Sequence, residues 1–220
     1  KTYHNFKDER EEHKHLTLLI TGNRATESWN GLNKPSDFFY AKGIIISVFE
    51  RLGITRFKES PTNEDIFAEG LTFSHGKSQL LSFGIIKKNI LKHFGISQEV
   101  IFADFNWDVI IEIAKYNKVK FKSIPKYPEV RRDFALLLDD NVSFESILNL
   151  AKQTEKKLLK SVNLFDVYQG ANLPKGKKSY AVSFIIQDDN KTLEESDIEI
   201  INKSIIQGIE KKFNAVLRDM

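Results

Sequence analysis

Two runs of alternating apolar and polar residues, 162–168 and 179–187, flank a turn rich in Gly and Pro. This pattern predicts a β-hairpin, because Gly and Pro supply the backbone conformations of a turn and interrupt the strands on either side. The hairpin constrains the fold, since it makes two successive strands neighbours in one sheet. Three basic side chains lie at its tip: Lys175, Lys177 and Lys178.

Elements around the hairpin complete a recognisable order. Residues 131–139 predict a buried strand, and Ser143 begins a helix with apolar residues at helical spacing. Thr192, three residues before Glu195, fits a capping box for a second helix. That helix carries an apolar stripe, and Val216 and Leu217 suit a short last strand. The order β-α-β-β-α-β predicts a ferredoxin-like sandwich with two helices on one face of an antiparallel sheet.

The alternation in 179–187 predicts which face of the sheet meets the helices. Successive side chains of a strand point to opposite faces. The bulky row should pack against the helices: Tyr180, Val182, Phe184 and Ile186. The smaller row is then left for solvent or a partner: Ala181, Ser183, Ile185 and Gln187.

The first half is less regular and predicts an α+β unit with a mixed sheet. Pro35 and Asp37 begin a helix that ends near Gly53, and further helices are expected at 87–94 and 107–115. The predicted strands are 16–20, 54–59, 66–73, 79–86 and 99–105. Residues 118–128 contain prolines and lysines typical of a linker. We therefore expect two domains, 1–124 and 125–220.

Composition excludes several classes of protein. The chain has no cysteine, so disulfides, Cys-ligated zinc and thiol catalysis are absent. Residues 1–15 have no apolar signal-peptide core, and no apolar run is long enough to span a bilayer, so we expect a cytoplasmic protein with no membrane partner. No phosphate-binding glycine loop or activated nucleophile is recognisable, which predicts a non-catalytic chain with no cofactor or metal of its own. His4, His13 and His15 lack a third ligand at metal-site spacing, and we expect them to be solvated at a frayed terminus.

Charge predicts at most a local nucleic-acid surface. Residues 125–220 carry 15 basic and 15 acidic residues, so any RNA contact must come from clusters. The candidate RNA-binding residues are Arg131, Arg132, Tyr168, Lys175, Lys177 and Lys178. Assuming that the first and third strands are parallel neighbours, we expect both basic clusters at one end of the sheet, with Tyr168 as a stacking surface. The alternative is an ordinary solvated hairpin and a core tyrosine.

Residues 125–220 also resemble a known family, the ferredoxin-fold anticodon-binding domain of the large (β) subunit of bacterial phenylalanyl-tRNA synthetase. The matching strings are 127–128, 131–136, 164–168, 175–181, 191–193 and 217–218. Residues 15–24, Trp29, 37–43 and 83–84 are similar to the end of the same subunit's class II synthetase-like core.

This resemblance implies the C-terminal piece of a longer subunit of phenylalanine–tRNA ligase. Such a piece supports the small (α) catalytic subunit and binds the anticodon stem-loop of tRNA(Phe). The family enzyme is a heterotetramer of two small and two large subunits, and ATP and Mg²⁺ are implied for the whole enzyme. The alternative, argued from the open sheet face alone, is a free-standing ferredoxin-like module that binds a protein or small ligand.

Overall fold

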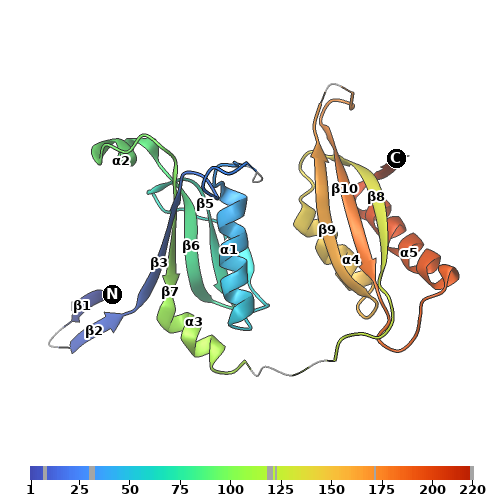
Figure 1. The fold of residues 1–220 in the computed structure, drawn as a ribbon, viewed down its shortest axis with the longest axis horizontal. Helices are drawn as coiled ribbons and strands as arrows, with labels where there is room; N and C mark the ends of the chain where they lie inside the picture. The colour runs from blue at the N-terminus through green and yellow to red at the C-terminus, as the bar shows by residue number, and fades with distance from the viewer. Residues whose placement is uncertain (7–8, 30–32, 118–120, 122, 171, 219–220) are drawn as a thin grey trace. The chain divides into compact units, whose positions relative to one another are not determined.

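The computed structural model describes residues 1–6, 9–29, 33–117, 121, 123–170 and 172–218, without the side chains of 4–10. The chain forms two compact units, Lys1–Phe121 and Lys122–Met220 (Figure 1). The division lies three residues before the expected boundary at 124. Each unit has its own apolar core and is described by itself.

The first unit is built on a five-stranded sheet with the order β3-β7-β6-β5-β4, in which every pair is antiparallel. The strands are β3 (His15–Thr21), β4 (Lys58–Pro61), β5 (Phe67–His75), β6 (Ser78–Ile86) and β7 (Val100–Asn106). The helices are α1 (Phe38–Arg51), α2 (Lys88–His93) and α3 (Trp107–Ala114). The predicted strand 54–59 is misplaced, because Ile54 is buried in the turn after α1 and the strand begins only at Lys58.

Helix α1 covers one face of this sheet. Asp37 caps it by accepting a hydrogen bond from the backbone N–H of Tyr40, which satisfies one of the free donors at a helix start. The pKa of Asp37 is lowered by that N–H and by the charge of Arg24. The buried side of the helix packs against a phenylalanine-rich core that includes Phe49, Phe73, Phe83 and Phe105.

Residues 2–6 and 9–13 form two paired strands, contrary to the expected frayed terminus. Strands β1 (Thr2–Phe6) and β2 (Glu9–His13) form a separate antiparallel ribbon. His13 Nε2 lies 3.5 Å from Glu11 Oε2. His15 begins β3, and its Nδ1 lies 3.0 Å from Asp104 Oδ2 across the sheet on β7. Both histidines thus have carboxylate neighbours, one on the same strand and one on the paired strand β7.

The second unit has the predicted ferredoxin-like fold. Its strands are β8 (Val130–Asp139), β9 (Leu159–Tyr168), β10 (Lys177–Ile186) and β11 (Val216–Arg218), in the order β11-β8-β10-β9. All pairs are antiparallel. Helices α4 (Phe144–Thr154) and α5 (Glu195–Phe213) lie on one side of the sheet (Figure 1).

The core of this unit is mostly aliphatic and confirms the predicted alternation of β10. The bulky row of β10 is buried with residues of α4 and α5, including Ile147, Ile205 and Ile209. Ser143 caps α4 as expected, accepting from the backbone N–H of Ser146. The capping box at Thr192 is wrong, because α5 begins two residues later and Glu194 stands at the cap without a side-chain hydrogen bond.

The opposite face of this sheet carries small side chains along its centre, and neither α4 nor α5 of this unit lies over it. Ser179, Ala181 and Ser183 of β10 point to this side, because Tyr180 and Val182 point to the core. We call this side the open face. None of the helices described in either unit is long and apolar enough to cross a membrane.

Candidate nucleic-acid interface

Tyr168 lies on the open face at the hairpin end of the sheet. It is the last residue of β9 and pairs with Ser179, and directly paired residues share a face. Its side chain is 41% exposed, so it is not a core residue. The ring lies against Gly170, where a Cβ would be only 2.6 Å from the tyrosine hydroxyl oxygen. Glycine at 170 therefore lets the ring lie against the chain.

An exposed carboxylate accompanies this tyrosine. Asp166 pairs with Ala181, so it shares the open face with Tyr168 two residues further on. Ser179, on β10 directly beside Tyr168, adds a small side chain with a hydroxyl group to the same face. An aromatic ring beside a carboxylate and a hydroxyl is a combination that can stack on an unpaired base and hydrogen-bond to its edge.

The three hairpin lysines have different environments. Lys175 is exposed in the turn, whose Gly176 adopts a positive φ of 79°. Lys177 lies on the open face with its Nζ 2.7 Å from Asp139 Oδ1. Lys178 is only 7% exposed and donates from Nζ to the carbonyl oxygen of Asp140 at 2.6 Å, 4.7 Å from the Tyr180 ring centre. Lys178 therefore stabilises the hairpin base and does not present its charge to a phosphate.

Arg131 and Arg132 point to opposite faces of the sheet. Arg132 Nη2 donates to both carboxylate oxygens of Glu195, at 2.6 and 2.7 Å, which ties β8 to the start of α5. Arg131 Nε donates to Asp133 Oδ1 at 2.8 Å, and this carboxylate raises the pKa of the guanidinium. The Arg131 guanidinium also lies 5.3 Å from the ring centre of Phe165.

The expected single basic rim is wrong. Strand β10 runs antiparallel to β8, so Lys177 pairs with Asp139 while Ile185 pairs with Arg131. The eight residue steps from Lys177 to Ile185 span about 27 Å. The arginines and lysines therefore lie at opposite ends of the sheet, and only the lysines share an end with Tyr168. Phe165, Asp166 and Ser179 were not among the predicted site residues.

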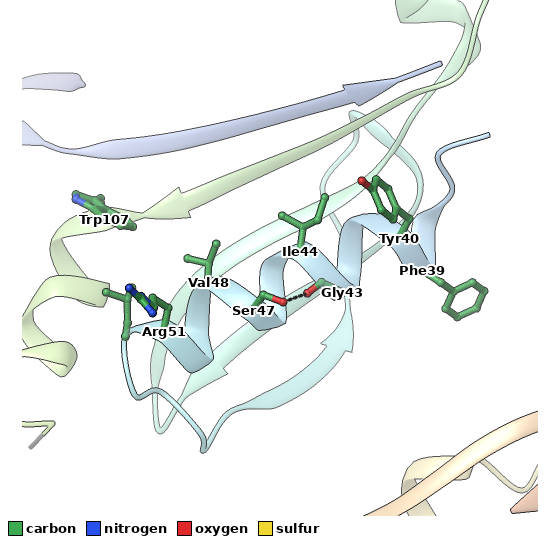
Figure 2. A pocket seen from close by; sticks show the side chains of 9 residues that line it. Phe39, Tyr40, Gly43, Ile44, Ser47, Val48, Arg51 and Trp107 are labelled. Carbon is green, nitrogen blue, oxygen red and sulfur yellow. Dashed lines mark hydrogen bonds between the residues drawn. The ribbon is translucent and has the colours of Figure 1, made fainter. Parts of the chain in front are cut away.

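The first unit offers a different surface, an apolar groove of about 830 Å³ along the outer side of α1. Ile44 and Val48 line it from the middle of the helix, and Phe39 and Tyr40 line it near the start of the helix (Figure 2). Trp107, at the start of α3, also lines the groove, and Arg51 lies near its end. Ser47 is occupied in a hydrogen bond to the carbonyl oxygen of Gly43. The lining contains no nucleophile paired with a base.

Among the residues that the structure describes, no group of three or more His, Cys, Asp or Glu is placed to hold a metal ion. The hydroxyl of Thr2 lies 3.3 Å from Nε2 of His15 in the His15–Asp104 pair. These contacts link β1 to the sheet and give the pair a structural role.

Comparison with known proteins places both units in one class. Residues 1–107 match the model of the phenylalanyl tRNA synthetase beta chain CLM domain. Residues 125–218 match the model of the ferredoxin-fold anticodon-binding domain. The order of the two domains defines a tRNA synthetase subunit.

Curated relatives agree with this class. The chain is 42% identical over 207 residues to the phenylalanine–tRNA ligase beta subunit of Bacteroides thetaiotaomicron, covering 93% of the chain and 25% of the relative. The corresponding protein of Porphyromonas gingivalis is 40% identical over 206 residues, covering 92% and 25%. The chain belongs to the phenylalanyl-tRNA synthetase β-subunit family. It spans about a quarter of the length of these relatives.

Proposed function

We propose that this chain is the tRNA-binding, non-catalytic region of a phenylalanine–tRNA ligase. In this role it binds the anticodon stem-loop of tRNA(Phe) and supports a small catalytic subunit. The observation that carries the proposal is Tyr168, an exposed aromatic ring on the open face of a domain that matches the anticodon-binding family.

In this proposal, RNA binding has two contributions: base stacking on the sheet face and electrostatic attraction at the hairpin. An unpaired anticodon base stacks on Tyr168, while Asp166 and Ser179 are placed to hydrogen-bond to its edge. Lys175 and Lys177 approach the phosphates from the hairpin, which positions the loop without reading its sequence. Asp139 is already paired with Lys177, so Lys175 makes the larger contribution to the salt dependence of binding.

We place the sites for ATP and Mg²⁺, implied for the whole enzyme, outside the described residues of this chain. Among the described residues no metal-ligand group is present, and the large groove along α1 is apolar. Both would be bound by the small subunit. We further propose the two-plus-two heterotetramer and a cytoplasmic location, on the grounds of membership in this ligase family.

The test is an equilibrium titration of the 220-residue chain with tRNA(Phe) and with an unrelated tRNA, at two salt concentrations. We expect tighter binding of tRNA(Phe), and a loss of about 1–3 kcal/mol with Tyr168→Ala at little change in salt slope. Val167→Ala is the matched control, because Val167 is 51% exposed on the same strand but points to the other face. Equal affinity for both tRNAs, unchanged by Tyr168→Ala, would contradict the proposal in favour of a free-standing interaction module.

A further inference from the structure

A β-bulge in β9 changes the direction of Phe165. Leu164 pairs with Val182 and Asp166 pairs with Ala181, so the pairing shifts and leaves Phe165 without a partner residue. Bulges of this kind re-aim a side chain and are common next to functional sites. The Phe165 side chain is 44% exposed, which is unusual for a phenylalanine on a strand of a small domain.

Arg131 reaches the same place from β8. It lies opposite Ile185, whereas Phe165 lies near the level of Ala181 and Val182, so the two side chains extend toward each other along the open face. Ser183 lies between them in the register and is only 2% exposed, although neither helix of this unit covers this face. The Arg131 guanidinium lies 5.3 Å from the Phe165 ring centre, so the two side chains meet on this part of the face.

The pair is held in place before any ligand binds. Asp133, two residues from Arg131 on the same face of β8, accepts a hydrogen bond from its Nε at 2.8 Å. The outer part of the guanidinium stays exposed, because the Arg131 side chain retains 54% of its accessible surface. A planar guanidinium held against an aromatic ring presents a flat, weakly hydrated surface.

We propose that Arg131 and Phe165 form a second base-stacking position on the open face, so that this face binds two unpaired nucleotides of one strand. Bases stack on arginine planes as well as on aromatic rings. Tyr168 lies three residues further along β9, about 10 Å away. The side chains of Ser179 and Ala181 are small, so they do not obstruct the sheet face between the two positions. The inference rests on the proposed RNA-binding function and extends it by one nucleotide.

Stacking on the second position contributes affinity with little base preference, because every base has a flat face. Base discrimination would then come from the Tyr168 position, where Asp166 and Ser179 supply hydrogen-bonding groups. Arg131 acts here mainly through its plane and not through its charge, since Asp133 already neutralises it.

The test uses the full chain and a set of anticodon stem-loop RNAs of tRNA(Phe), each with one loop base removed to leave an abasic sugar. For the unmodified chain, two of these RNAs should bind more weakly by about 5- to 150-fold each. Tyr168→Ala should remove the penalty at one abasic position, and Phe165→Leu at the other. Leu keeps an apolar side chain at the bulge, so the fold is preserved.

Two further variants sharpen the result. Arg131→Lys keeps the charge and loses the plane, and should weaken binding by about 2- to 5-fold with an unchanged salt slope. Val167→Ala should leave the whole abasic profile as it is. A single sensitive position, or an unchanged profile for Phe165→Leu, would overturn the second stacking position while leaving the anticodon-binding function intact. Failure of the unmodified chain to bind any stem-loop would instead overturn the proposed function, and this inference with it.

Discussion

The two units leave apolar surface exposed in different shapes. In the first unit it lies in a groove between α1 and Trp107, lined by aliphatic and aromatic side chains. In the second unit it consists of two rings, Phe165 and Tyr168, on a sheet face whose central residues are small. The groove is concave and mostly uncharged, whereas the open face combines flat rings with lysines at one end and an arginine at the other.

Because the two surfaces differ in shape and charge, each is suited to a different kind of binding partner. A concave apolar groove accommodates side chains, and the lining of the groove along α1 contains a single cation, Arg51. A sheet face with small central side chains and exposed rings accommodates nucleotides, because the bases stack on flat rings and the phosphates are attracted by nearby positive charge. The sequence alone placed every candidate RNA-binding residue in the second unit, but it did not predict the groove of the first unit.

The largest expected effect comes from separating the units. A protein of residues 125–220 should fold alone, because its core is closed by its own two helices, and it should retain tRNA binding. A protein of residues 1–121 should lose tRNA binding entirely. Amide spectra report folding and titration with tRNA(Phe) reports binding. An unfolded spectrum for residues 125–220 would show that the boundary is misplaced.

The second expected effect separates two neighbouring lysines of the hairpin. Lys178→Ala should lower the free energy of unfolding by about 1.5–3 kcal/mol, because it removes a buried charged donor from the Asp140 carbonyl. Lys175→Ala should leave stability within about 0.5 kcal/mol and reduce the slope of log affinity against log salt by about one. Denaturant unfolding and salt-dependent titration measure the two quantities. The reverse assignment of effects would mean that Lys178 contacts RNA.

A smaller effect, confined to the first unit, is expected from the cap of α1. Asp37→Ala should cost about 1 kcal/mol, because the Tyr40 N–H loses its acceptor. The pKa of Asp37 is lower in the folded chain, so its charge stabilises the fold above the ordinary carboxyl pKa and this contribution is lost as the pH falls below about 4. Asp37→Asn should keep most of the cap and lose this acid dependence. Equal acid sensitivity in the Asn variant would assign the dependence to another group.

The smallest effect tests the groove directly. Phe39→Ala should change neither stability nor tRNA affinity measurably, since the side chain is 78% exposed and lies on the first unit. Thermal unfolding and titration with tRNA(Phe) are the measurements. A several-fold loss of tRNA affinity would place RNA contacts on the groove and remove the contrast between the two surfaces.

Much of the second unit could be predicted because its patterns are local. The stripe on α5 and the alternation of β10 each repeat over several turns or residues, and burial follows the repeat. The same alternation also indicates that Lys178 is buried, because Lys178 lies two residues before Tyr180 and points to the same face of β10. The hairpin makes β10 antiparallel to β9, as predicted. The error lay in taking β10 as parallel to β8, with which it pairs antiparallel.

Other features depend on contacts that no local pattern contains. The start of α5 at Glu195 coincides with the Arg132–Glu195 ion pair, which joins residues 63 positions apart. In the sequence, the only sign of the bulge is that Leu164 and Phe165 are both apolar, where strict alternation would place one apolar residue. The second stacking position consequently escaped prediction, because it needs the bulge and a strand far away in the sequence.

The short strand β11 has a consequence for how the chain behaves at high concentration. It pairs with only three residues of β8, Ala135, Leu136 and Leu137, so the first half of β8 has no strand beside it on that edge among the described residues. Arg131, Arg132 and Asp133 occupy that half. Charged side chains at a bare edge discourage another copy from adding a strand. These charged residues therefore also oppose self-association, and replacing them with neutral residues would favour aggregation even in the absence of RNA.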